Sequence, residues 1–185
     1  LLATHEANNA DVTIAGIPVN DSVSSAFGIM RFNSNGRVEG FLEKPKTANE
    51  LDLVRTDPAW IEQAGIQAAG RSLMASMGIY LFDRDCLLDL LLKTDYQDFG
   101  KEVFPAAIRA KHVQLHPFDG YWEDIGTIAS YYQCNIDLAS SKPPFELATP
   151  HAPIYSRARF LPPSRVDGAS VQGSLISDGC TIGAG

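Results

Sequence analysis

Six of the eleven prolines of this 185-residue chain fall between Lys142 and Pro163. Proline fixes its own φ angle and has no backbone N–H to donate, so this segment can form neither a long helix nor a central strand. We interpret residues 142–165 as an ordered linker between two domains. Residues 1–141 then form one domain, and residues 166–185 form the beginning of another.

Residues 1–141 show strand patterns that alternate with helical ones. The segments 26–32 and 38–43 flank the turn Asn33-Ser34-Asn35-Gly36 and predict a hairpin, because Gly36 can adopt positive φ. A longer apolar run at residues 73–82 predicts a central strand. Alternation of this kind is typical of an α/β domain with a mostly parallel sheet and helices on both faces.

Residues 166–185 carry a different pattern. Apolar residues stand at positions 166, 171, 176 and 182, with glycines between them. This near-hexapeptide spacing predicts the first coils of a parallel β-helix, which needs further coils to bury its faces. An acyltransferase with hexapeptide repeats is an alternative, but only about two coils are visible and no catalytic His accompanies them.

Composition and charge limit the functional classes. The net charge of −7 argues against a nucleic-acid surface, which needs a basic patch. No apolar run approaches the length of a membrane span. The three cysteines, Cys86, Cys134 and Cys180, form no Cys-x-x-Cys pair, which favours free thiols in a reducing compartment. The chain begins without Met and ends within a repeat, so we expect it to be a fragment of a longer protein.

The stretch from Tyr121 to Thr127 (Tyr-Trp-Glu-Asp-Ile-Gly-Thr) lies where a predicted strand gives way to a predicted helix. Thr127 can cap that helix, because its hydroxyl can accept a hydrogen bond from a free backbone N–H. Asp124 is a candidate ligand for a divalent metal that holds phosphates. Taken by itself, the stretch fits an ordinary turn aspartate better.

A second chemical candidate is the run Glu43-Lys44-Pro45, which follows the predicted hairpin. A lysine ammonium suits a sugar phosphate, and a glutamate carboxylate accepts hydrogen bonds from sugar hydroxyls. Pro45 biases Lys44 towards an extended backbone. The alternative is an exposed Glu–Lys pair of the kind that is common at strand ends.

Five motifs in order resemble the glucose-1-phosphate adenylyltransferases, also called ADP-glucose pyrophosphorylases. They are Ser25-Ala26-Phe27-Gly28, Phe41-Leu42-Glu43-Lys44-Pro45, Ala75-Ser76-Met77-Gly78-Ile79-Tyr80, Asp98-Phe99-Gly100-Lys101 and the stretch from Tyr121 to Thr127. Ala152-Pro153-Ile154-Tyr155 and Phe160-Leu161-Pro162-Pro163 are most similar to the cyanobacterial and plant branch.

The resemblance implies a Rossmann-like nucleotidyltransferase domain followed by a left-handed parallel β-helix. It implies synthesis of ADP-glucose and pyrophosphate from ATP and glucose 1-phosphate, with Mg²⁺ as cofactor, for glycogen or starch. Gly28, Glu43, Lys44 and Ser76 match the residues that bind glucose 1-phosphate, and Asp124 matches a metal ligand. On chemistry alone, Ser76 fits equally well as a small residue in a buried strand, and Gly28 as a glycine that relieves crowding.

The resemblance also implies regulation by an anionic metabolite and assembly into a homo- or hetero-tetramer. Arg159 matches a regulatory arginine, whereas Arg157 stands where plant-type members have a neutral residue. Side chains at i and i+2 of an extended segment share one side, so both guanidiniums could converge on a phosphate. A solvated basic stretch is the alternative. The expected compartment is the cytoplasm, or the plastid stroma in a plant or alga.

One departure limits what these residues can do alone. The family's glycine-rich nucleotide loop and first metal carboxylate belong before the first residue of this chain, and no Gly-x-Gly-x-Arg pattern occurs in it. We therefore assign no catalytic residue and expect the chain alone to be inactive. Two alternatives stay open: a sugar-1-phosphate nucleotidyltransferase with another base or sugar, and a non-catalytic regulatory subunit of the same family.

Overall fold

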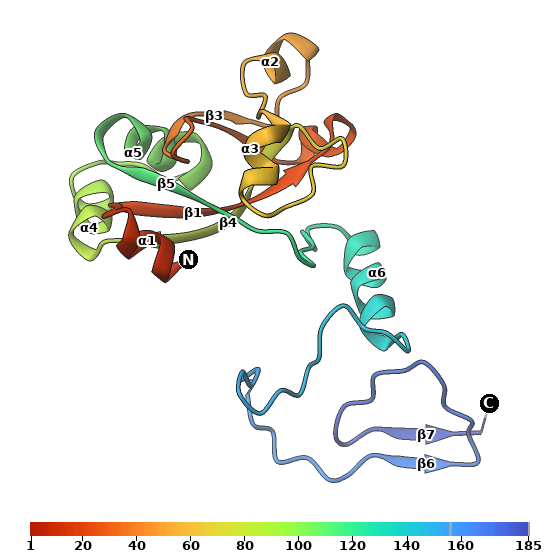
Figure 1. The fold of residues 1–185 in the computed structure, drawn as a ribbon. Helices are drawn as coiled ribbons and strands as arrows, with labels where there is room; N and C mark the ends of the chain where they lie inside the picture. Colours follow the sequence, from red (N-terminus) through yellow and green to blue (C-terminus); the bar gives the residue numbers. More distant parts are fainter. Residues whose placement is uncertain (156, 185) are drawn as a thin grey trace. The chain divides into compact units, whose positions relative to one another are not determined.

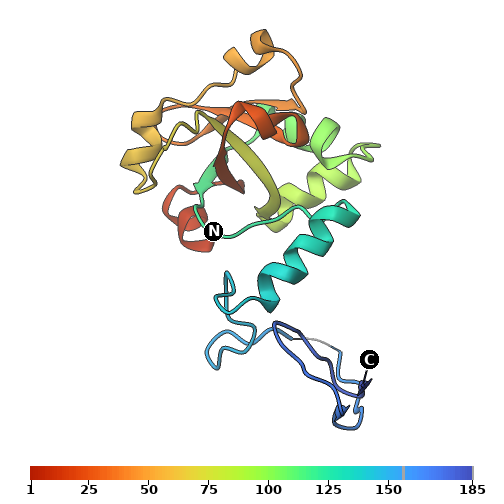
Figure 2. The same ribbon diagram turned by 90° about the vertical axis from the view of Figure 1, so that its right-hand side faces the viewer.

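The computed structural model describes residues 1–155 and 157–184. The chain divides into two compact units, Leu1–Gly120 and Tyr121–Gly185, and each is described by itself. Figures 1 and 2 show the ribbon in two perpendicular views.

The first unit contains one sheet and several short helices. Its strands are β1 (Val12–Val19), β2 (Gly28–Phe32), β3 (Val38–Glu43), β4 (Leu73–Phe82) and β5 (Val113–Pro117). Its helices are α1 (Leu2–Ala7), η1 (Asp21–Ala26), α2 (Ala48–Asp52), α3 (Pro58–Gln63), α4 (Arg84–Leu92), η2 (Phe99–Val103) and α5 (Phe104–Ala110). The predicted hairpin is present as β2 and β3, which pair antiparallel around the Asn33–Gly36 turn.

The sheet is mixed and mostly antiparallel, so the prediction of a mostly parallel sheet is wrong. Its strand order is β3-β2-β4-β1-β5, and β1–β5 is the parallel pair in it, whereas β1–β4, β2–β3 and β2–β4 are antiparallel. Parallel neighbours need a long crossover connection. The helices α2 and α3 are short and return the chain to β4 in the antiparallel sense, and the longer run through α4, η2 and α5 leads to β5.

The sheet carries apolar side chains on both faces. Ile61 of α3, Leu90 of α4 and Phe104 of α5 pack in a cluster with the alternate strand residues Met30 and Met74. A second, smaller cluster contains the neighbouring strand residues Ile29 and Leu73, together with Leu51 of α2. Because successive residues of a strand point to opposite faces, helices cover both faces of the sheet.

The second unit contains α6 (Ile128–Ala139) and the short strands β6 (Arg165–Asp167) and β7 (Thr181–Gly183). Thr127 caps α6 as predicted: its hydroxyl accepts the Ser130 N–H at 3.1 Å, and the Ser130 hydroxyl accepts the Thr127 N–H at 3.2 Å. The two strands β6 and β7 form one parallel pair. The described residues of this unit contain no other strand, so the predicted β-helix is not shown. The predicted domain limits at residues 141 and 165 stay predictions.

Candidate functional site

Gly28 and Glu43 face one another across the pair formed by β2 and β3. A Cβ atom at position 28 would overlap Cζ of Phe41 and would lie 2.9 Å from Oε2 of Glu43. Only glycine leaves room for the Phe41 ring and the Glu43 carboxylate over this buried backbone. Two of the sequence-predicted site residues are therefore in direct register.

Lys44 follows β3 and has a left-handed backbone, with φ of 52°. The expectation of an extended backbone before Pro45 is wrong. The Lys44 N–H donates to the carbonyl oxygen of Phe27 at 3.0 Å, and this bond closes the end of the hairpin while the chain turns away. A lysine in this region is strained by about 1–2 kcal/mol. Its Nζ lies 3.7 Å from Oε1 of Glu43, and the Lys44 side chain is 58% exposed.

Ser76 lies where β4 departs from regular pairing with β1. Gly16 pairs with Ser76 and Ile14 pairs with Tyr80, so one residue of β1 stands opposite three of β4. Gly78 adopts φ of 70° inside this bulge, and its N–H donates to Oγ of Ser76 at 3.2 Å. Bulges re-aim side chains and are common beside active sites.

Tyr80 joins this cluster, although no sequence pattern assigned it a role. Burial raises the pKa of its phenol, and a hydrogen bond with Ser76 opposes this shift. The negative charges of Glu43 and Asp98 raise the pKa further. The phenol therefore lies among three of the polar side chains of the site. Its position at the end of the motif that contains Ser76 was the signal that could have identified it.

Asp98 and Gly100 bring a further segment to the same place. Oδ1 of Asp98 accepts the Lys101 N–H at 2.8 Å and caps the helical turn η2. A Cβ at position 100 would lie 3.4 Å from Oε2 of Glu43. The Lys101 ammonium lies 4.0 Å from Asp98 and is 69% exposed, so a second cation stands at the edge of the cluster.

Aromatic rings pack beside these polar groups. The rings of Phe41 and Phe104 are 5.0 Å apart and nearly perpendicular, and the Tyr80 ring lies 5.5 Å from Phe104 and 6.1 Å from Phe99. Edge-to-face and tilted pairs of this kind hold aromatic side chains in fixed orientations. The polar cluster thus combines carboxylates, hydroxyls and two lysines on a packed aromatic base, a set that can bind a polyhydroxylated phosphate.

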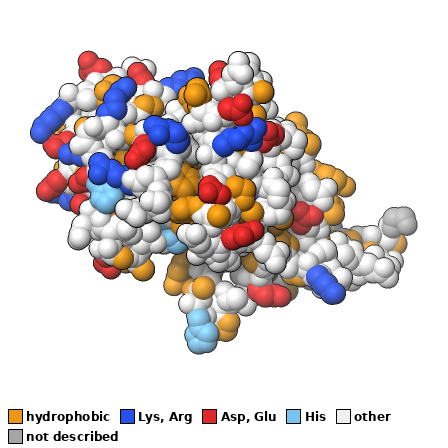
Figure 3. Space-filling view, turned by 45° about the horizontal axis from the view of Figure 1, so that its top comes forward, with side chains coloured by type: hydrophobic (Ala, Val, Ile, Leu, Met, Phe, Trp, Pro, Cys, Tyr) orange, Lys and Arg blue, Asp and Glu red, His pale blue; other side chains and the backbone are white. Residues whose placement is uncertain are grey.

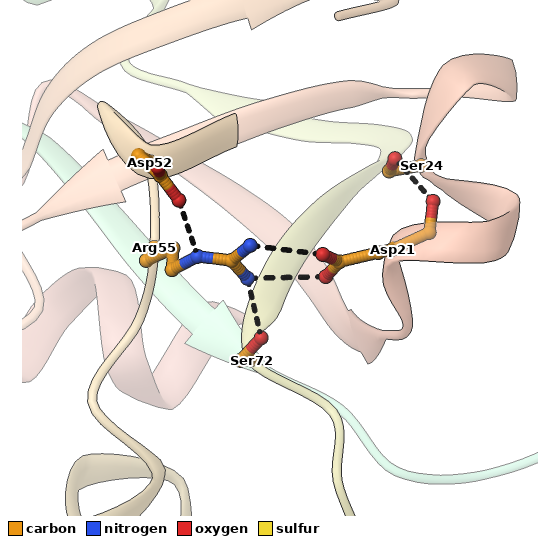
Figure 4. Close-up of polar contacts among 5 residues, drawn as sticks. All are labelled: Asp21, Ser24, Asp52, Arg55 and Ser72. Atoms are coloured by element: carbon orange, nitrogen blue, oxygen red, sulfur yellow. Dashed lines mark hydrogen bonds and ion pairs between the residues drawn. The ribbon is translucent and has the colours of Figure 1, made fainter. Parts of the chain in front are cut away.

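Arg55 fixes the segment that leads to Gly28 (Figure 4). Its guanidinium donates to both carboxylate oxygens of Asp21, at 3.1 and 2.9 Å, and to Asp52 at 2.8 Å and Ser72 at 3.0 Å. Asp21 begins η1, and Ser24 secures the same turn by donating to the Asp21 carbonyl at 2.7 Å. The turn η1 ends at Ala26, two residues before β2 begins.

Asp124 lies in the second unit, in the exposed stretch before α6. Its Oδ1 accepts the Gly126 N–H at 3.2 Å, and its Oδ2 has no hydrogen-bond partner among the described residues. No group of three His, Cys, Asp or Glu side chains among those residues could enclose a metal ion. Mg²⁺ commonly takes one or two carboxylates and completes its shell with phosphates and water, so the exposed Asp124 fits as one such ligand.

Arg157 and Arg159 line one hollow of about 600 Å³ in the second unit, together with Asp178. Both arginines are exposed. No ion pair joins either arginine to another described residue. Two uncommitted guanidiniums on one hollow can bind an anion, although the carboxylate of Asp178 lowers the local positive potential.

A family model described as nucleotidyl transferase matches residues 1–141, which is most of the chain. The chain belongs to the nucleotidyl transferase family. Gly28, Glu43, Lys44, Ser76 and Asp124 all lie within the part that matches this family, whereas Arg157 and Arg159 lie outside it.

The surface of this nucleotidyl transferase carries charges of both signs. Figure 3 shows basic and acidic side chains next to one another over the visible face, with hydrophobic atoms between them. Among the helices in the described part of the chain, none has the length and hydrophobicity needed to cross a bilayer.

Proposed function

We propose that this nucleotidyl transferase acts on glucose 1-phosphate and ATP to form ADP-glucose and pyrophosphate. The observation that carries the proposal is the convergence of Gly28, Glu43 and Ser76 with Tyr80 and Asp98. These residues come from separate segments of the sequence, and each segment belongs to a motif that resembles the glucose-1-phosphate adenylyltransferases.

Each side chain of the cluster has a role in this proposal. The Lys44 ammonium pairs with the phosphate of glucose 1-phosphate, and the Glu43 carboxylate accepts hydrogen bonds from the glucose hydroxyls. Ser76 orients the same ligand through its hydroxyl, and Gly28 allows the ligand to approach the backbone. The strained backbone of Lys44 supports this assignment, because strained residues cluster at sites where geometry is fixed for function.

The proposed reaction is an in-line displacement at the α-phosphorus of ATP. A phosphate oxygen of glucose 1-phosphate forms the new P–O bond, and the bond between the α- and β-phosphates breaks to release pyrophosphate. Mg²⁺, when bound, offsets the negative charge of the phosphates. Asp124 would supply one oxygen ligand to that ion, and the contribution of the sugar-phosphate residues is to hold the attacking oxygen in place.

The first experiment compares ligands and variants. We expect the chain to bind glucose 1-phosphate in calorimetric titrations, and we expect Lys44→Ala to weaken that binding by roughly tenfold or more, because the charge-assisted contact is lost. Lys46→Ala is the matched control, since Lys46 is also exposed and lies two residues away. Equal affinity in the Lys44 and Lys46 variants, or no binding by the unmodified chain, would contradict the proposal.

The choice of nucleotide is tested by pyrophosphorolysis with a protein that joins these residues to the family's glycine-rich nucleotide loop. ADP-glucose, UDP-glucose and GDP-mannose are offered separately, and ADP-glucose should be cleaved fastest. A faster reaction with another nucleotide sugar would retain the family and refute the substrate. Failure to cleave any of them, with glucose 1-phosphate still bound, would favour a regulatory subunit.

We further propose that the hollow beside Arg157 and Arg159 takes an anionic regulatory metabolite. The support is the placement of both guanidiniums on one hollow without an ion pair to any described residue. Inorganic phosphate, followed by ³¹P NMR, is the probe. Arg159→Ala should reduce the saturable broadening of its signal, whereas Arg84→Ala, which removes an exposed arginine on α4, should leave it unchanged. The reverse pattern would refute the assignment.

A further inference from the structure

A cavity of about 320 Å³ lies between the turn of the β2–β3 hairpin and the segment that contains α3. None of the residues that line it belongs to the cluster around Glu43 and Ser76. Its volume is at the lower end of the range for small-molecule sites, so it can hold a molecule the size of one sugar ring.

The cavity has a fixed aromatic wall. Phe32 and Trp60 line it, with ring centroids 4.5 Å apart at an interplanar angle of 61°. The indole N–H of Trp60 donates to the carbonyl oxygen of Ser34 at 3.0 Å. A ring held by both packing and a hydrogen bond is a rigid apolar surface on which the C–H face of a sugar can lie.

Several polar groups on the wall lack partners among the described residues. The Gln63 amide and the Ser34 hydroxyl make no side-chain hydrogen bond there, and Oδ2 of Asp57 is also unused, since Oδ1 alone accepts the Ala59 N–H. Thr56 also lines the cavity and is only 5% exposed, and its Oγ1 is a buried hydroxyl without a partner. Because this oxygen has almost no accessible surface, a molecule in the cavity would bond to Ser34, Asp57 and Gln63 and not to Thr56.

The charges around the cavity select against anions. Arg55 is the cation on its wall, and its guanidinium is already occupied by Asp21, Asp52 and Ser72 (Figure 4). The carboxylate of Asp57 adds a further negative charge. A phosphate or carboxylate would meet these acids without a free cation to bind it, whereas neutral hydroxyls can donate to Asp57 and Gln63 and accept from Ser34.

We propose that this cavity is a binding site for a neutral hexose unit, free or at the end of an oligosaccharide. The unit lies against Trp60, and its hydroxyls bond to the unpartnered groups of Ser34, Asp57 and Gln63. The proposal does not depend on the nucleotidyl transfer reaction, because the cavity shares no residue with the sugar-phosphate cluster.

The test uses the indole N–H signals in NMR spectra of the 185-residue chain. The two tryptophans give two signals, which a Trp122→Phe variant assigns. Glucose and maltotriose should each shift the Trp60 signal in a saturable manner, and inorganic phosphate should not. A shift with maltotriose alone would identify an oligosaccharide end as the ligand, and a shift with glucose alone would identify the free sugar.

Variants separate this site from the sugar-phosphate cluster. Gln63→Ala should weaken glucose binding roughly fivefold, the effect of losing one hydrogen bond, without a cost to folding, because the amide is exposed and unbonded. Gln172→Ala, at an exposed glutamine of the other unit, is the control. Glu43→Ala should leave the Trp60 response intact.

Three outcomes would overturn the proposal. They are a Trp60 signal that no neutral sugar shifts, a response that Glu43→Ala abolishes, and a response to inorganic phosphate stronger than that to glucose. None of them depends on whether glucose 1-phosphate binds, so the two proposals can fail separately.

Discussion

The carboxylate of Glu43 occupies the space beside the backbone of Gly28, with Oε2 2.9 Å from the point where a Cβ atom of residue 28 would lie. The two residues pair across β2 and β3, and the Phe41 ring fills the rest of that space. The absence of a side chain at position 28 therefore allows the Glu43 carboxylate and the Phe41 ring to lie over the strand.

Gly28→Ala should disrupt this arrangement. The new methyl group would overlap the Phe41 ring, which packs against Phe104, so the ring and Glu43 must both move. We expect the free energy of unfolding to fall by about 1–3 kcal/mol, because an added methyl group in a well-packed site typically destabilises a protein by that amount. Urea denaturation measures this loss, and glucose 1-phosphate binding should fall with it.

Gly40→Ala is the control for that prediction, because it lies on β3 of the same hairpin. A Cβ there would meet only the flexible side chain of Arg31, at 3.2 Å. Its effect should be small. Equal losses at the two positions would show that glycine content of the hairpin, and not the contact with Glu43, sets the cost.

Lys44 should show opposing effects on stability and binding. Its left-handed backbone costs a side-chain-bearing residue about 1–2 kcal/mol, and glycine avoids that strain at an entropic cost of about 0.5–1 kcal/mol. Lys44→Gly should therefore be more stable than Lys44→Ala by about 0.5–1 kcal/mol in urea denaturation. Both variants lose the ammonium, so both should bind glucose 1-phosphate weakly.

Ala69 provides the comparison for Lys44. It also has a left-handed backbone, with φ of 47°, and it lies outside the cluster around Glu43. Ala69→Gly should gain similar stability without any change in glucose 1-phosphate binding. If Lys44→Gly binds as well as the unmodified chain, the lysine side chain has no part in the site.

Local sequence signals predicted local structure well. The Asn33–Gly36 turn and the Thr127 cap both depend on neighbouring residues, and both are present. The sense of the strands was not predictable in the same way, because it depends on where the chain returns after α2 and α3. The backbone of Lys44 was predicted wrongly. Pro45 disfavours the right-handed helical region for Lys44, but this constraint alone does not separate the extended region from the left-handed one. In the structure the left-handed backbone accompanies the hydrogen bond from the Lys44 N–H to Phe27.

The candidate site was predicted only in part. Gly28, Glu43 and Ser76 were chosen from separate motifs, and the structure adds Tyr80 and Asp98 to them. No spacing rule relates Ser76 to Glu43, and the Ser76 hydroxyl accepts the Gly78 N–H where β4 bulges away from β1. Bulges of this kind depend on pairing with a distant strand, so sequence patterns along β4 alone do not reveal them.

The raised pKa of Tyr80 should lower the free energy of unfolding at alkaline pH. Burial is the main cause that raises the pKa of its phenol above the ordinary value of 10.0. Above pH 10 the unfolded chain then loses the Tyr80 proton while the folded chain keeps it, so the free energy of unfolding decreases as pH rises towards the folded pKa. In Tyr80→Phe this decrease should be smaller, as thermal denaturation between pH 9 and 11 would measure.

The phenylalanine variant keeps the packing of the ring against Phe104 and Phe99, so the comparison isolates the hydroxyl. Tyr96→Phe removes an exposed tyrosine hydroxyl for comparison. Identical alkaline curves for Tyr80→Phe and the unmodified chain would mean that the phenol does not stay protonated on folding.

The two-point contact between Arg55 and Asp21 should couple their contributions to stability. Both side chains are partly exposed, at 39% and 49%, so a single pair would contribute only about 0.2–1 kcal/mol. The fork geometry and the added bonds to Asp52 and Ser72 favour the upper part of that range. A double-mutant cycle with Arg55→Lys and Asp21→Asn should therefore give a coupling of about 0.5–1 kcal/mol, because lysine keeps the charge and loses the fork.

The coupling should also depend on pH in one direction. The hydrogen bond from Arg55 is the main cause that holds the pKa of Asp21 below its ordinary value of 3.8. The Asp21 carboxylate therefore binds its proton at a lower pH in the folded chain than in the unfolded chain. Its contribution to the free energy of unfolding is present above pH 3.8 and disappears as the pH falls through the folded pKa. The same cycle with Arg84 and Asp85, which are 84% and 91% exposed, should give almost no coupling at any pH. Equal coupling in both pairs would mean that charge alone, and not the fixed fork of Arg55, holds the turn that leads to Gly28.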